Sequence, residues 1–73
     1  MKLVINGSDV VVSDGISVRQ LLLERKVKMP DMVSVELNEI VLQRTEFETT
    51  QLHENDRIEL LYFMGGGRGT DTV

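Results

Sequence analysis

The segment RIELLYFM at residues 57–64, followed at once by GGG at residues 65–67, decides how this chain is organised. The segment is strongly apolar and of β-strand type, but glycines cannot continue it, because glycine weakens a strand interior. Only residues 68–73 follow, and we expect none of them to pair with the strand. The sequence therefore predicts a folded domain at residues 1–64 and a flexible glycine-rich tail at residues 65–73. A frayed linker or expression scar is the plain alternative for the tail.

Composition limits the fold and the chemistry. A chain of 73 residues with no cysteine forms one domain whose small core rests on aliphatic packing. It can hold neither a disulfide nor a thiolate-bound cluster, so covalent chemistry must use another group. The net charge of −4 and the lack of a basic stripe argue against nucleic-acid binding and favour a positively charged protein partner. No bilayer-spanning stretch or signal peptide is present, so we expect a cytoplasmic protein without membrane contact.

The first half of the chain predicts a hairpin and a helix. Asn6-Gly7 is a strong two-residue turn signal between a strand at residues 2–6 and a returning strand at residues 10–12. Ser17 and Gln20 have the spacing of a helix capping box, so we expect a helix to begin at Ser17. Pro30 prevents the helix from continuing, and we expect its end at residues 25–27.

The second half predicts further strands around a polar loop. Residues 32–37 alternate in polarity, Asn38-Glu39 is a turn, and residues 40–42 continue as a short strand. Residues 43–56 form a loop, with one short helical turn and with Phe47 and Leu52 as apolar anchors.

The order of these elements predicts an α+β fold. The last strand is the most apolar, so we expect it at the centre of the sheet, beside and parallel to the first strand and buried on both sides. A mixed four- to five-stranded sheet with one helix on one face results. This is the ubiquitin-like β-grasp arrangement.

The usual catalytic patterns are absent from the sequence. His53 is the only histidine and lies in the polar loop, so we interpret it as solvated. The carboxylates are spread over several exposed segments, which predicts neither a metal site nor an acid–base pair. Gly65-Gly66-Gly67 is not a phosphate-binding loop, because no Lys-Ser/Thr pair follows it.

Alternation in the last strand suggests a binding surface. If Ile58 and Leu60 point into the core, then Leu61 and Phe63 point outward, just before the glycines. An exposed apolar patch beside a flexible tail is typical of a docking surface. The alternative is that Leu61 and Phe63 pack under the polar loop.

The chain resembles the ThiS family of sulfur carriers in thiamine (thiazole) biosynthesis. The resemblance covers residues 1–67 and is carried by LVING at 3–7, VRQLLL at 18–23, VSVELN at 33–38 followed by Ile40-Val41, and DRIELLYFMGGG at 56–67. Each motif is short, and their order, spacing and total length make the resemblance specific.

The resemblance implies a carrier protein without catalytic residues or a bound cofactor. In the family a ThiF-like adenylating enzyme converts the terminal glycine carboxylate to an acyl adenylate. Sulfur from a cysteine desulfurase relay then gives a thiocarboxylate, which a ThiG-like thiazole synthase uses. By this match Gly66 and Gly67 are the functional pair, Gly65 adds flexibility, and Leu61 and Phe63 face the adenylating enzyme. We expect the carrier to be a monomer.

The chain departs from the family pattern at its end, because RGTDTV at residues 68–73 follows the glycines. A protease removes these residues, or the working end lies elsewhere, or this copy is not a functional carrier; a cut after Gly66 or after Gly67 fits equally. Three other functions share the fold. They are the sulfur carrier of molybdopterin synthesis, a ubiquitin-like protein modifier, and a partner-binding β-grasp module.

Overall fold

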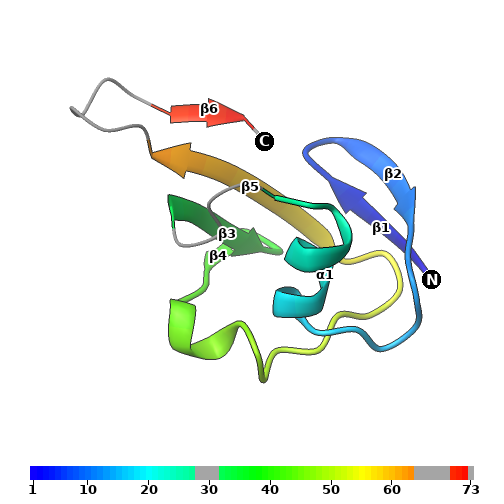
Figure 1. Ribbon diagram of the computed structural model, residues 1–73. Coiled ribbons are helices and arrows are strands. Elements are labelled where there is room, and N and C mark those ends of the chain that lie inside the picture. Colours follow the sequence, from blue (N-terminus) through cyan, green and yellow to red (C-terminus); the bar gives the residue numbers. More distant parts are fainter. Residues whose placement is uncertain (28–31, 64–69, 73) are drawn as a thin grey trace.

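The computed structural model describes residues 1–27, 32–63 and 70–72. Its strands form one mixed sheet in the order β2-β1-β5-β3-β4, with β6 also paired to β5 (Figure 1). The elements in chain order are β1 Lys2–Ile5, β2 Ser8–Val11, α1 Val18–Glu24, β3 Val33–Leu37, β4 Ile40–Val41, the 3₁₀ turn η2 Arg44–Glu46, β5 Arg57–Phe63 and β6 Thr70–Thr72. The strand β5 runs parallel to β1 and antiparallel to β3, which confirms its predicted place at the centre of the sheet.

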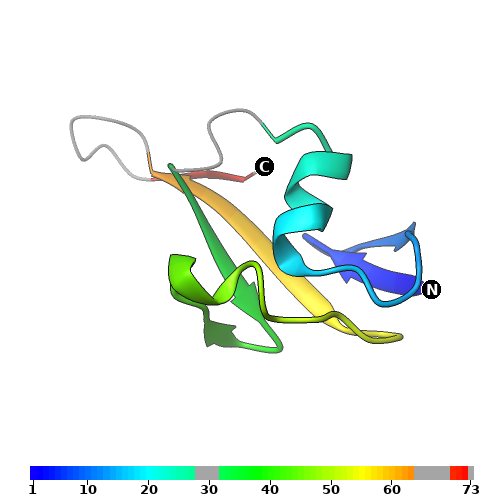
Figure 2. The same ribbon diagram turned by 60° about the horizontal axis from the view of Figure 1, so that its bottom comes forward.

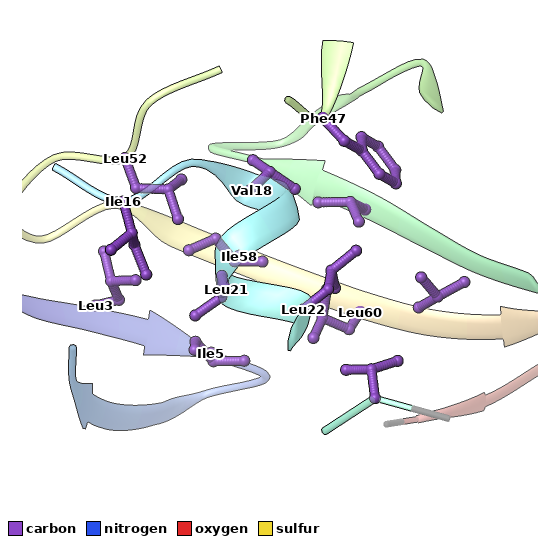
Figure 3. Packing of buried hydrophobic residues seen from close by; sticks show 13 residues of the cluster. Leu3, Ile5, Ile16, Val18, Leu21, Leu22, Phe47, Leu52, Ile58 and Leu60 are labelled. Carbon is purple, nitrogen blue, oxygen red and sulfur yellow. The ribbon is translucent and has the colours of Figure 1, made fainter. Parts of the chain in front are cut away.

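The helix α1 lies across one face of the sheet, and the apolar side chains fill the layer between them (Figures 2 and 3). This arrangement confirms the predicted β-grasp fold. No helix within the described ranges is long and apolar enough to cross a membrane. The core consists of Leu3, Ile5, Ile16, Val18, Leu21, Leu22, Val27, Val33, Val35, Phe47, Leu52, Ile58 and Leu60.

The strand β5 is buried on one face only. Ile58 and Leu60 are almost completely inaccessible to solvent, and Tyr62 packs partly against the same core. Glu59, between them, is exposed on the opposite face. The expectation that β5 is buried on both sides is therefore right for its two paired edges and wrong for its faces, because the single helix covers only one face of the sheet.

The helix begins as predicted and ends for a reason that the sequence did not indicate. Ser17 Oγ accepts a hydrogen bond from the Gln20 N–H (3.1 Å), and Gln20 Oε1 accepts one from the Ser17 N–H (2.9 Å), which completes the capping box. At the other end Lys26 takes a left-handed conformation (φ 53°), and the Lys26 and Val27 amides donate back to the carbonyls of Leu23 and Leu22. This is a Schellman motif, whereas Pro30 lies outside the described residues.

Two tight turns set the register of the outer strands. Asn6 and Gly7 both have positive φ (49° and 83°), as a type I′ hairpin turn requires, and Ile5 pairs with Ser8 across the turn. The returning strand β2 therefore starts at Ser8, two residues earlier than expected. Asn38 and Glu39 make a similar turn between β3 and β4, with φ of 50° and 72°.

The polar segment 43–56 is a loop with one short helical turn, as predicted. Phe47 and Leu52 are buried and anchor the loop to the core. Backbone carbonyls of the loop also accept hydrogen bonds from the first turn of the helix. The Val18 N–H donates to the Thr50 carbonyl and the Arg19 N–H to the Phe47 carbonyl (3.0 Å each). The loop thereby satisfies helix amides that have no partner within the helix.

The strand β6 was not expected. Residues Thr70–Thr72 pair antiparallel with β5, with Leu61 opposite Thr72 and Phe63 opposite Thr70. The expectation that nothing after the glycines pairs with the last strand is therefore wrong. Strand pairing is made by backbone groups, so a short polar segment with no apolar pattern can form it. The glycines at 65–67 lie outside the described residues, and the flexibility of this segment stays a prediction.

Candidate functional site

Asn6 ends the pairing between β1 and β5. Its backbone N–H donates to the Ile58 carbonyl (2.9 Å), and its side chain then binds Leu60. The Leu60 N–H donates to Asn6 Oδ1 (2.8 Å), and Asn6 Nδ2 donates to the Leu60 carbonyl (3.4 Å). The side-chain amide thus replaces one more residue of the β1 strand while the backbone turns away at Gly7. The edge of β5 beyond Leu60 is left to other partners.

We predict that Asn6→Ala lowers the free energy of unfolding by about 1–3 kcal/mol, because it leaves the Leu60 amide in the sheet without its acceptor. The measurement is urea unfolding followed by circular dichroism. Asn55→Ala is the matched control, because Asn55 also has a positive φ (69°) but is exposed in a turn. We expect a smaller loss for the control. Equal losses in the two variants would show that the cost lies in the backbone conformation and not in the hydrogen bonds to Leu60.

The open face of the sheet carries Leu61, one of the two predicted docking residues. Leu61 is half-buried and does not belong to the apolar residues that pack against the core. It lines a depression of about 430 Å³ together with Asn6, Gly7, Glu36 and Glu59. An apolar side chain at the border of an open depression is available to a partner, and its role in docking stays a prediction.

Two carboxylates face each other beside Leu61. Glu36 of β3 and Glu59 of β5 are directly paired across the strands. Like charges directly opposite each other destabilise a sheet, so this arrangement favours a basic side chain from a partner. A second depression of about 210 Å³ continues from them towards Glu39 and Arg57. The sequence does not indicate that Glu36 and Glu59 meet, because their meeting depends on the register of β3 on β5.

The other predicted site residues are placed only in part. Phe63 is the last residue of β5 and is paired with Thr70. The structure describes its backbone only, so its role in docking stays a prediction. Gly65, Gly66 and Gly67 also lie outside the described residues, so their role remains a prediction. The structure therefore places Leu61 and Phe63 on one strand, and in the sequence only Met64 separates the end of this strand from the glycines.

The described part of the chain offers no conventional catalytic or metal centre. His53 is exposed. Its ring Nδ1 lies 3.8 Å from Asp56 Oδ2, and its backbone N–H donates a hydrogen bond to the same oxygen (2.7 Å). These contacts close the turn that leads into β5. Among the described residues no group of three or more His, Cys, Asp or Glu side chains is close enough to hold a metal ion.

A mixed sheet grasping one helix, with a central strand that leads from an open acidic and apolar face into three glycines, defines a ubiquitin-like β-grasp protein. The sequence also matches the ThiS family model over residues 3–67. The chain belongs to the ThiS family, the sulfur carriers of thiamine biosynthesis.

Solved structures of similar proteins agree with this family. The crystal structure of the thiamine biosynthesis protein ThiS from Geobacter metallireducens is 42% identical, with a TM-score of 0.84, over 92% of this chain and 100% of that one. The solution structure of a thiamine biosynthesis protein from the same organism is 41% identical, with a TM-score of 0.77, over 94% of this chain and 91% of that one.

Two sequence relatives extend the comparison. The uncharacterized protein ycf40 of Pyropia yezoensis is 40% identical over 63 residues, which cover 86% of this chain and 87% of the relative. The thiazole synthase of Magnetococcus marinus is 34% identical over 68 residues, which cover 93% of this chain and 21% of that enzyme. The chain therefore corresponds to about a fifth of the enzyme's length.

Proposed function

We propose that this chain carries sulfur as a thiocarboxylate on Gly67 and delivers it for formation of the thiazole ring of thiamine. The observation that carries the proposal is the extent of the family match, which runs from residue 3 to residue 67 and stops at the last of the three glycines. Residues 68–73 lie beyond it. We therefore favour Gly67 over Gly66 as the working terminus.

The proposal requires hydrolysis of the peptide bond between Gly67 and Arg68. Water adds across this bond and leaves a carboxylate on Gly67 and a free amine on Arg68. A carboxylate is a poor electrophile, so a ThiF-like adenylating enzyme must activate it: the carboxylate attacks the α-phosphorus of ATP and pyrophosphate leaves. The resulting acyl adenylate has a good leaving group, AMP, which the outer sulfur of a persulfide from a cysteine desulfurase relay replaces, giving an acyl disulfide. A second thiol of the relay then attacks the inner sulfur, so the thiocarboxylate leaves with the electron pair and the two relay sulfurs form a disulfide.

The chain itself acts as a substrate of its partners and not as an enzyme. Glycines without β-carbons allow the terminus to enter a narrow active site, and the folded domain supplies the surface that these enzymes recognise. The chemistry needs ATP and reduced sulfur, so we place it in the cytoplasm.

Thiazole synthase is the proposed acceptor of the sulfur. A thiazole synthase from Magnetococcus marinus contains a segment similar to this chain, which amounts to 21% of its own length. When a carrier domain and a synthase are joined in one polypeptide, the link raises the effective concentration of each for the other and so favours their direct interaction. This supports a direct complex between the present chain and a separate ThiG-like synthase.

The test of the proposal is the intact mass of the protein. The full chain is incubated with extract from its own source cells, and then with the adenylating enzyme, ATP and a sulfur donor. We expect a species that ends at Gly67 and then gains the mass of one oxygen-to-sulfur exchange. A mass fixed at full length, in extract that processes other carriers, would argue for a β-grasp binding module. Attachment to lysines of other proteins would argue for a protein modifier.

We predict that Leu61→Glu weakens binding of the chain to the adenylating enzyme by about tenfold or more, because it removes an apolar contact and puts a charged group that must lose its water into the interface. The measurement is isothermal titration calorimetry with the chain trimmed at Gly67. Val11→Glu is the matched control, because Val11 is apolar and 83% exposed on the edge strand β2. Equal affinities of the two variants would place the docking face elsewhere.

A further inference from the structure

One edge of β5 is divided among three partners. β1 pairs with Arg57 and Ile58, the Asn6 side chain binds Leu60, and β6 pairs with residues 61–63. The other edge belongs to β3, which pairs with residues 58–62. Leu61 and Tyr62 therefore have β3 on one side and β6 on the other, so β6 occupies the edge that β1 leaves free. Figure 1 shows β6 beside the end of β5.

β6 runs back along β5 from the end of that strand. Phe63 and Thr70 are directly opposite each other, and Thr72 is opposite Leu61, so the three residues of β6 line the last three residues of β5.

The same pairing occupies the edge of β5 next to the candidate docking surface. Thr72 is opposite Leu61, which lines the depression with Glu36 and Glu59. A partner that contacts Leu61 and the end of β5 has to share this edge with the β6 backbone or displace it.

We infer that the pairing of β6 with β5 is an autoinhibitory contact: Thr70–Thr72 occupy the edge of β5 beside Leu61, which a partner needs, until residues 68–73 are removed. The inference rests on the proposed function, in which Gly67 becomes the carrier terminus. Cleavage then does two things at once. It creates the carboxylate, and it frees the edge of β5.

The short length of β6 makes the contact dependent on the covalent connection. While the chain is intact, a short connection holds β6 near β5 at an effective concentration of about millimolar. A separate peptide loses this advantage, and a three-residue backbone pairing is too small to offset the translational freedom lost on binding. The released peptide therefore leaves after the cut.

The test compares four proteins: the intact chain, the chain ending at Gly67, and two intact double variants. The first variant is Asp71→Pro with Thr72→Pro. Successive amides of a strand point to opposite edges, so one of these two faces β5 and is lost in this variant. The matched control, Asp71→Ala with Thr72→Ala, changes the same side chains and keeps both amides. The readouts are the Kd for the adenylating enzyme and amide hydrogen exchange at residues 61–63.

We expect the intact chain and the alanine variant to bind the adenylating enzyme at least about tenfold more weakly than the trimmed chain, because only a minor fraction has the edge free. The proline variant should recover most of this affinity and should lose exchange protection at residues 61–63. Four equal affinities, together with sulfur transfer to the trimmed chain, would overturn the autoinhibition and leave the carrier function intact. If even the trimmed chain neither binds nor gains sulfur, the proposed function and the inference both fail.

Discussion

Replacing Gly67 by valine in a chain trimmed at this residue is expected to reduce the initial rate of thiocarboxylate formation by about 100-fold or more. A branched side chain at the terminus collides with the walls of an active site that accepts an unsubstituted backbone, and a misplacement of about 1 Å at the reacting atom is enough for such a loss. The measurement is intact mass against time, with the adenylating enzyme, ATP and a sulfur donor.

Two controls separate this effect from damage to the fold. Gly65→Val places the same side chain two residues before the terminus and should cause a smaller loss. The thermal unfolding of both variants should match that of the trimmed parent, because no residue of the described core comes after Leu60. A Gly67→Val chain that gains sulfur at the parental rate would contradict the assignment of Gly67 as the reacting residue. A lowered melting temperature would show that the tail contributes to the fold.

Leu60→Ala is expected to lower the free energy of unfolding by about 2–5 kcal/mol. Leu60 is fully buried, lies on the central strand, and points into the layer between sheet and helix (Figure 3). A domain of 73 residues is stable by only roughly 4–11 kcal/mol in total, so this one substitution removes a large part of its stability.

The neighbouring position provides the matched control for the core variant. Leu61→Ala makes the same chemical change one residue further along β5, on the open face, where we expect a loss below about 1 kcal/mol. Urea unfolding followed by circular dichroism measures both. Similar losses would mean that the two faces of β5 contribute equally, which the burial of Leu60 and the half-exposure of Leu61 argue against.

The elements near strong local signals could be predicted from the sequence. The capping residues Ser17 and Gln20, the Asn6-Gly7 turn and the alternation along β5 each act within a few residues, so their structural outcome is determined by neighbouring side chains and backbone preferences. The central place of β5 could also be predicted from the sequence, because the most apolar strand is expected at the centre of a sheet, with a neighbouring strand on each edge.

The features that could not be predicted depend on backbone pairing and on register. The segment that forms β6 has no apolar pattern. It can be recognised as a strand only from the structure, in which it pairs with the edge of β5 that β1 leaves free. The helix ends where Lys26 takes a left-handed conformation. The sequence does not indicate this, because the residues that usually take this conformation are glycine and asparagine. The two hydrogen bonds between the Asn6 side chain and Leu60 join residues 54 positions apart, which no local pattern indicates.

The sequence by itself determined the β-grasp fold and the core face of β5, because hydrophobic periodicity, capping and turn preferences are local properties of the chain. Only the tertiary structure decided that Glu36 meets Glu59 beside Leu61 and that β6 occupies the remaining edge of β5. These contacts join segments distant in sequence, and they form only when the register of the strands is set by the packed sheet.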